Sequence, residues 1–130
     1  MMTNKNMQII TMLTLLLLTI SGCQNEDVRE KENIKIGISY PITGALSNFG
    51  EAEKNGAILA VEQINRNGGI NGKRIELIVE DNEYDVENQL SIFRKFIYQD
   101  KVDAILTGWT AMTTAVIPII EESKTPTFTW

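Results

Sequence analysis

The feature that most constrains the fold is the stretch 34–72, in which a strand pattern, a loop and a long helix pattern follow one another. Isoleucine alternates with polar or small residues from Ile34 to Ser39, which predicts a strand, and Tyr40-Pro41 ends it. A helix pattern follows Thr43-Gly44 and ends at Gly68-Gly69, because glycine readily adopts the left-handed conformation of a C-terminal cap. Such a strand and helix cannot bury their apolar sides alone, so the remaining chain must supply neighbours.

Small and apolar residues form one face of this helix, and Ser47 or Asn48 can cap its start. The predicted apolar stripe, spaced at i, i+3, i+4 and i+7, consists of Ala57, Ala60, Val61 and Ile64. The residues that lie largely off the stripe are Glu53, Lys54 and Glu62. We expect Gly56, together with the alanines, to let this face lie close on a sheet.

The rest of the chain repeats the alternation. We predict strands at 74–81, 102–107 and 126–130, separated by two helices. Asp85 is the expected cap of the first helix, with Asn88 at the third helical position. Its apolar stripe consists of Val86, Leu90, Phe93 and Ile97, widened by Ile92 and Phe96. The second helix is predicted from about Met112 to Glu122, with a kink at Pro118.

This alternation predicts an α/β fold with a doubly wound parallel sheet, in the strand order 2-1-3-4. In such sheets ligands bind beyond the carboxyl ends of the strands, where the strand order switches. Here the switch lies between the first and third strands. The prediction therefore selects two loops as the candidate site, residues 40–49 and residues 108–114.

Composition excludes several classes of function. The chain has 12 basic and 17 acidic residues, an acidic balance that disfavours nucleic acid as a partner. It contains no histidine and one cysteine, so an internal disulfide is impossible and the usual zinc ligands and general base are missing. The sequence also carries no phosphate-binding loop and no nucleophile elbow. We therefore expect no metal, no cofactor and no enzyme activity.

The first part of the sequence has the pattern of an export signal. Residues 1–8 are polar with one positive charge, and an apolar run follows from Ile9 to Ile20, which is short for a membrane-spanning helix. The segment Ile20-Ser21-Gly22-Cys23 is similar to a bacterial lipobox. We therefore predict a lipoprotein signal peptide at 1–22, lipid attachment at Cys23, and a solvated tether at 23–33. The alternative is an ordinary signal with an incidental cysteine.

Several elements of 34–126 resemble one known family. They are Thr43-Gly44, Gly50, Glu62-Gln63-Ile64-Asn65 and Gly68-Gly69-Ile70-Asn71-Gly72. The combination resembles the mature start of substrate-binding proteins of ABC importers with the type 1 periplasmic-binding fold, in the branched-chain amino acid and amide group. The resemblance implies two lobes that close on a small solute and deliver it to membrane permease subunits. Residues 34–130 would then form the first part of the N-terminal lobe, so we expect a truncated chain.

The loop 108–114 combines hydroxyl groups, an aromatic ring and main-chain N–H groups at a helix start, which suits a carboxylate or amide oxygen. The resemblance places Thr110, Ala111 and Thr113 nearest to the polar end of the ligand. Trp109 is either a ligand contact, as in the amide- and urea-binding branch, or a packed loop aromatic. Phe49 is either an aromatic beside the ligand or a hydrophobic staple at the helix start.

Two alternative interpretations remain. An acidic cluster could hold magnesium, but solvated loop carboxylates and a helix cap are the favoured explanation. The cluster consists of Glu80, Asp81, Glu83 and Asp85. For the whole chain, the leading hypothesis is an extracytoplasmic, lipid-anchored solute-binding protein of an importer. The rival hypothesis is a sensory or regulatory receptor domain of the same fold.

Overall fold

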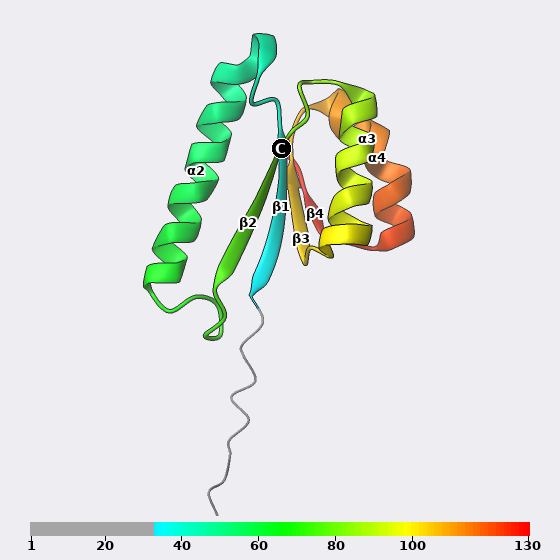
Figure 1. Ribbon diagram of the computed structural model, residues 1–130. Helices are drawn as coiled ribbons and strands as arrows, with labels where there is room; N and C mark the ends of the chain where they lie inside the picture. Colours follow the sequence, from blue (N-terminus) through cyan, green and yellow to red (C-terminus); the bar gives the residue numbers. More distant parts are fainter. Residues whose placement is uncertain (1–32) are drawn as a thin grey trace, which may run out of the picture. The chain divides into compact units, whose positions relative to one another are not determined.

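The structure, a computed structural model, describes residues 33–130 (Figure 1). In chain order the elements are β1 (Ile34–Tyr40), a 3-10 turn η1 (Gly44–Leu46), α2 (Ser47–Arg66), β2 (Ile75–Asp81), α3 (Val86–Arg94), a π-helical segment η2 (Lys95–Asp100), β3 (Ala104–Thr107), α4 (Thr110–Ser123) and β4 (Thr127–Phe128). The predicted signal peptide, the lipid site at Cys23 and most of the tether lie outside the described residues.

The four strands form one parallel sheet in the order β2-β1-β3-β4, so the predicted α/β fold and strand order are confirmed. Helix α2 covers one face of the sheet, and α3 and α4 cover the other (Figure 1). Because the strands are parallel, their carboxyl ends share one edge. The loops after β1 and β3 leave the sheet at this edge, next to each other in the strand order.

The core lies between the sheet and the α3–α4 layer. Its buried cluster consists of Ile92, Phe93, Phe96, Val102, Ile105 and Val116. Phe96 packs flat against β1 at Gly37, where an added Cβ would lie 2.7 Å from the ring. Glycine at this strand position therefore makes room for an aromatic side chain. The stripe predicted for α3 is correct at Phe93 and Phe96, whereas Val86 is exposed.

Helix α2 packs with a different face from the one predicted. Ala57 and Val61 are half-buried as expected, but Ala60 and Ile64 are exposed. The face continues instead to Asn65, whose side-chain amide pairs with both main-chain groups of Ile75 at 2.7 and 2.8 Å. Polar anchoring of the helix to an edge strand thus replaces part of the apolar packing.

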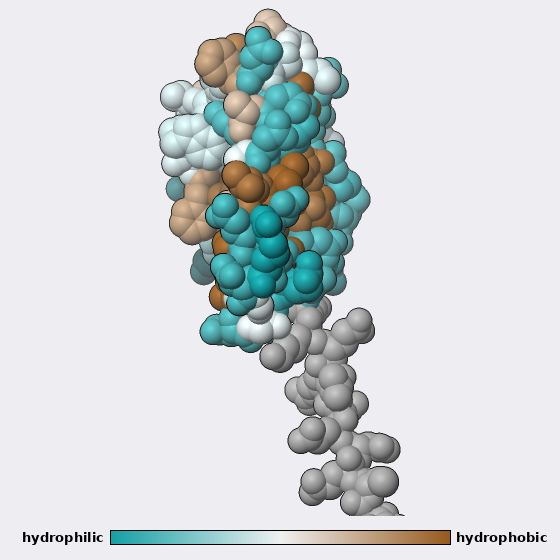
Figure 2. Space-filling view, turned by 90° about the vertical axis from the view of Figure 1, so that its left-hand side faces the viewer, coloured by the Kyte–Doolittle hydropathy of each residue, from teal (hydrophilic) through white to brown (hydrophobic). Residues whose placement is uncertain are grey.

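The outward side of α2 keeps an apolar patch, visible midway along this side of the molecule (Figure 2). The exposed large apolar residues of this helix include Ile58, Leu59 and Ile64. Single exposed apolar residues are normal, but a contiguous group often marks a contact surface. Within residues 33–130, no helix has both the length and the apolar character needed to cross a membrane.

The start of α2 is held by close contact rather than by the predicted cap. Neither Ser47 nor Asn48 caps it, since the cap position is Leu46 and makes no side-chain hydrogen bond with the described residues. Instead, Gly50 lies against the loop after β1, where an added Cβ would be 2.1 Å from the Pro41 carbonyl oxygen. The close approach expected at Gly56 is wrong, because nothing lies within 4 Å of a Cβ there.

The other helix ends follow local signals more closely. The predicted cap of α3 is confirmed, because the Asp85 carboxylate accepts a hydrogen bond from Asn88 N–H at 2.8 Å. Helix α4 begins at Thr110, two residues before the predicted start. Pro118 lies inside α4 without ending it. The predicted end of α2 at the two glycines is also confirmed, because Gly68 and Gly69 have positive φ angles of +94° and +75°.

Candidate functional site

A hollow of about 300 Å³ opens at the carboxyl edge of the sheet. It is lined by Phe49, Glu53, Trp109, Thr110 and Trp130. The first two come from α2, Trp109 and Thr110 come from the junction of β3 with α4, and Trp130 follows β4. Segments far apart in the sequence therefore meet at the position where doubly wound sheets bind ligands.

Trp109 is the centre of an aromatic cluster beside this hollow. Its ring packs edge to face against Phe49 at a centroid distance of 5.9 Å and against Tyr84 at 5.7 Å. Its backbone has a φ of +72°, which is strained for a residue with a bulky side chain. Strain of this kind costs about 1–3 kcal/mol and occurs most often at functional sites.

The start of α4 presents main-chain N–H groups to the same region. Trp109 is the N-cap residue, and its carbonyl accepts a hydrogen bond from the Thr113 N–H at 2.9 Å. Its side chain makes no capping hydrogen bond with the described residues. The first turn of α4 contains no acidic residue. Helix N-termini carry partial positive charge, so this turn favours an anionic or carbonyl oxygen.

Glu53 lies on α2 one turn after Phe49 and supplies the only charged side chain among the five lining residues. Its Oε1 accepts a hydrogen bond from Trp130 Nε1 at 3.3 Å. Burial raises the pKa of the neighbouring Tyr40 hydroxyl well above its usual value, and the charge of Glu53 raises that pKa further. Both the Glu53 Oε2 and the Trp109 Nε1 are buried without a hydrogen-bond partner among residues 33–130.

A buried polar network lies beneath the hollow and joins the strand ends that support it. Gln89 on α3 accepts hydrogen bonds from Ser39 Oγ at 2.5 Å and from Asn82 Nδ2 at 3.0 Å. Its own Nε2 donates to Thr107 Oγ1 at 3.0 Å. All four side chains are fully buried. A satisfied network of this kind fixes a single arrangement of β1, β3 and the chain after β2.

Two residues of the acidic cluster, Glu80 and Asp81 at the end of β2, have structural partners. Asp81 accepts hydrogen bonds from the Ile42 N–H at 2.8 Å and the Thr43 hydroxyl at 2.6 Å. Burial alone would raise the pKa of Asp81, but hydrogen bonds from Thr43, Glu83 and Ile42 outweigh it and lower the pKa. Glu80 pairs with Lys95 at 2.8 Å. No group of histidine, cysteine or acidic residues suited to a metal ion occurs in the described part of the chain.

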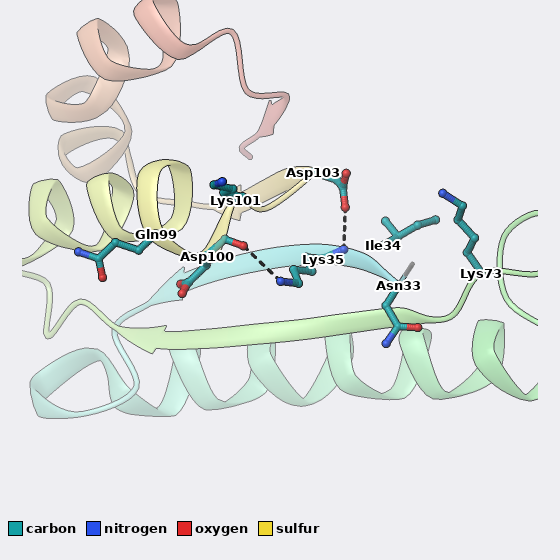
Figure 3. A pocket seen from close by; sticks show the side chains of 8 residues that line it. All are labelled: Asn33, Ile34, Lys35, Lys73, Gln99, Asp100, Lys101 and Asp103. Atoms are coloured by element: carbon teal, nitrogen blue, oxygen red, sulfur yellow. Dashed lines mark hydrogen bonds between the residues drawn. The ribbon is translucent and has the colours of Figure 1, made fainter. Parts of the chain in front are cut away.

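A second hollow of about 330 Å³ lies at the opposite edge of the sheet (Figure 3). It is lined by Asn33, Ile34, Lys35, Lys73, Gln99, Asp100, Lys101 and Asp103. Two hydrogen bonds of Lys35 cross it: the main-chain N–H donates to the Asp103 carboxylate at 2.8 Å, and Nζ donates to the Asp100 carbonyl at 3.4 Å. These contacts join the start of β1 to the start of β3, away from the loops selected from the sequence.

The structure brings three of the five predicted ligand residues to one hollow, namely Phe49, Trp109 and Thr110. Ala111 is exposed and is not among the lining residues. The Thr113 hydroxyl lies within hydrogen-bond distance of the Gly108 carbonyl, at 3.5 Å, and of the Thr129 hydroxyl, at 3.0 Å. Their contact with a ligand stays a prediction.

Sequence reasoning missed two lining residues. Glu53 was placed off the packing face of its helix, yet it is half-buried. The spacing of four residues from Phe49 was the available signal, because residues four apart share a helix face. Trp130 was assigned only to the last strand. Its indole folds back over Gly108, where an added Cβ would lie 2.8 Å from the ring.

Comparison with known proteins decides the family. The family described as "Periplasmic binding protein" matches residues 33–130. The chain belongs to the periplasmic binding protein family. Family membership implies an extracytoplasmic location, and it agrees with the observed sheet order.

Two relatives of this periplasmic binding protein are named as amino acid binding proteins. One is the leucine-, isoleucine-, valine-, threonine- and alanine-binding protein of Pseudomonas aeruginosa, 33% identical over 66 residues, which cover 51% of this chain and 18% of that protein. Another is an amino acid binding protein of the same organism, 33% identical over 92 residues, which cover 71% of this chain and 25% of the relative.

Solved structures of similar proteins have the same fold. The branched-chain amino acid transporter substrate-binding protein LivJ of Streptococcus pneumoniae, in complex with isoleucine, has a TM-score of 0.71 and 33% identity, over 75% of this chain and 28% of that one. A fatty acid ABC transporter substrate-binding protein of Thermomonospora curvata has a TM-score of 0.69 and 31% identity, over 75% of this chain and 25% of that one. This periplasmic binding protein therefore spans about a quarter of the length of these relatives, all of which are named as binding proteins.

Proposed function

We propose that this chain is part of the solute-binding component of an ABC importer, and that its hollow receives the polar end of a branched-chain amino acid or of a related amino acid or amide. The supporting observation is the junction of β3 and α4. There the first turn of α4 has no side-chain cap among residues 33–130, and Thr110 lines the hollow together with the paired rings of Phe49 and Trp109. Such a site holds an oxygen by hydrogen bonds and an aliphatic side chain by apolar contact.

The rest of the proposal is supported by the names of the relatives and by the export-signal pattern at the start of the sequence. A second lobe would close over this hollow, exclude water and complete the contacts, so the described lobe alone should bind weakly. Permease subunits in the membrane would receive the solute. Cys23 would carry the lipid that keeps the protein at the outer side of a bacterial membrane.

Thermal unfolding with and without solute tests the binding proposal. The panel is leucine, isoleucine, valine, acetamide and urea. A solute present at about 100 times its Kd adds about 2.7 kcal/mol to the free energy of unfolding, which raises the Tm of a domain of this size by several degrees. We expect at least one amino acid to raise the Tm and the Thr110→Val variant to lose much of that effect.

Thr114→Val is the matched control, because the Thr114 hydroxyl bonds to the Thr110 carbonyl at 2.7 Å and does not line the hollow. A panel in which no solute raises the Tm would contradict the proposed ligand class. The lipid anchor has a separate test: Cys23→Ser should abolish incorporation of labelled palmitate in bacterial cells. Continued labelling of that variant would refute attachment at Cys23.

A further inference from the structure

Glu53 is the one charged residue among the five that line the hollow, which otherwise offers hydroxyl, amide and aromatic groups. It lies four residues after Phe49 on α2, so both side chains project from one face of the helix toward the hollow. The next residue, Lys54, does not neutralise it, because the Lys54 ammonium pairs with Glu51 at 2.6 Å. The hollow therefore contains one carboxylate and no cationic side chain among its lining residues.

The hydrogen bonding of Glu53 is incomplete. Its Oε1 has one long bond, 3.3 Å, from the Trp130 indole, and its Oε2 has no partner among residues 33–130 although the atom is buried. A carboxylate can accept about four hydrogen bonds, and leaving a buried charged acceptor unpaired is costly. The indole N–H of Trp109, on the other side of the hollow, is likewise buried and unpartnered in the described part of the chain.

We propose that the Glu53 carboxylate recognises the ammonium group of the solute, so that the hollow selects α-amino acids over solutes of the same shape that lack an amino group. This inference rests on the proposed function, since it takes the hollow as the solute site. An ammonium group offers three N–H donors and a compensating positive charge. The solute carboxylate, one bond away from the ammonium-bearing carbon, is then directed toward the first turn of α4.

Trp130 occupies the position that the ammonium takes. Its indole N–H is the one donor to Glu53 among residues 33–130. Trp130 remains 62% exposed, and the edge of its ring contacts Tyr40 at a centroid distance of 5.3 Å. A charged donor forms a shorter and stronger bond to a carboxylate than a neutral indole does. The solute therefore displaces the indole from Glu53, and removing the indole N–H should strengthen binding.

Tryptophan fluorescence reports directly on this site, because the two tryptophans of the chain, Trp109 and Trp130, both line the hollow. We would titrate the chain with leucine and with 4-methyl-2-oxopentanoate, which has the same carbon skeleton and carboxylate but no amino group. The variants are Glu53→Gln, which keeps the shape and an acceptor for Trp130, and the matched control Glu51→Gln one half-turn away. Trp130→Phe tests the displacement, read from Trp109 alone.

The expected result is that Glu53→Gln weakens leucine binding by about tenfold or more, while 4-methyl-2-oxopentanoate binding changes by less than about twofold. Glu51→Gln should retain leucine binding, whereas Trp130→Phe, which removes the donor that competes for Glu53, should strengthen it. Equal weakening for both solutes, or unchanged leucine binding in Glu53→Gln, would overturn the role of Glu53 while the proposed function stands. If the unaltered chain responds to neither solute, the proposed function itself fails.

Discussion

Gln89 accepts a hydrogen bond from the Ser39 hydroxyl at 2.5 Å, although the two residues are separated by 50 positions in the chain. The same amide reaches Thr107 at 3.0 Å. One side chain of α3 thus holds the ends of β1 and β3, the strands that precede α2 and α4, and these two helices contribute lining residues to the hollow.

Replacing Gln89 with leucine should destabilise the fold strongly. The substitution leaves the buried polar groups of Ser39, Asn82 and Thr107 without their shared partner, at an expected cost of about 2–4 kcal/mol in the free energy of unfolding. Urea denaturation measures the change. Gln63→Leu, at an exposed position of α2, should change stability by less than about 0.5 kcal/mol. Equal stability of the two variants would show that the network contributes nothing.

The two helical glycines of α2 should respond to alanine in opposite directions. At Gly50 the new Cβ would lie 2.1 Å from the Pro41 carbonyl oxygen, so the loop after β1 must move. At Gly56 nothing lies within 4 Å, and alanine should stabilise the helix by about 0.5–1 kcal/mol. We expect Gly50→Ala to lower the Tm and Gly56→Ala to raise it. A higher Tm for Gly50→Ala would contradict the close contact.

Asn65 should account for much of the attachment of α2 to β2. Asn65→Ala removes both hydrogen bonds to the main chain of Ile75 and should cost about 1–3 kcal/mol. Asn55→Ala is the control on the same helix, because Asn55 is exposed and alanine there favours helix. Chemical denaturation of the pair checks the prediction, which fails if Asn65→Ala is as stable as Asn55→Ala.

Asp81 makes stability depend on pH. Hydrogen bonds to Asp81 outweigh its burial and lower the pKa of its carboxyl group in the folded chain. The ionised carboxylate therefore stabilises the fold above the unfolded-state pKa of about 3.9. This stabilisation is lost as the pH falls through the pKa of the folded state. Asp81→Asn should therefore be less stable than the unaltered chain at about pH 6, by about 1 kcal/mol. The difference should shrink below about pH 4.

Denaturation curves at several pH values give this difference directly. Glu76→Gln, at an exposed position of β2, serves as the control for loss of one negative charge. A stability difference between Asp81→Asn and the unaltered chain that stays constant down to about pH 2 would show that the Asp81 charge is not involved.

The strand order could be predicted from sequence because it follows from few rules. Alternating strand and helix patterns imply a wound parallel sheet, and short connections leave few arrangements. The cap at Asp85 was equally predictable, since an aspartate side chain can accept from a main-chain N–H three residues later. Both predictions depend on local chemistry that the residue types alone determine.

The face of α2 and the start of α4 were harder to predict because tertiary contacts decide them. Hydropathy favours Ala60 and Ile64 as packing residues, but the edge strand is bound through Asn65, and Gly50 sets how closely the helix approaches the loop. Helix α4 starts at Thr110 because Trp109 adopts a φ of +72°. A positive φ at tryptophan has no signal in the sequence.

The most direct test of the proposed site is the NMR signal of the Trp109 indole N–H in ¹⁵N-labelled protein, titrated with isoleucine to about 10 mM, which populates even a site with a Kd of about 1 mM. We predict that this signal and the amide signal of Thr110 shift progressively, while the amides of Lys35 and Lys101 at the opposite edge stay unchanged. Unchanged Trp109 and Thr110 signals, or shifts confined to Lys35 and Lys101, would contradict a solute site at the carboxyl edge of the sheet.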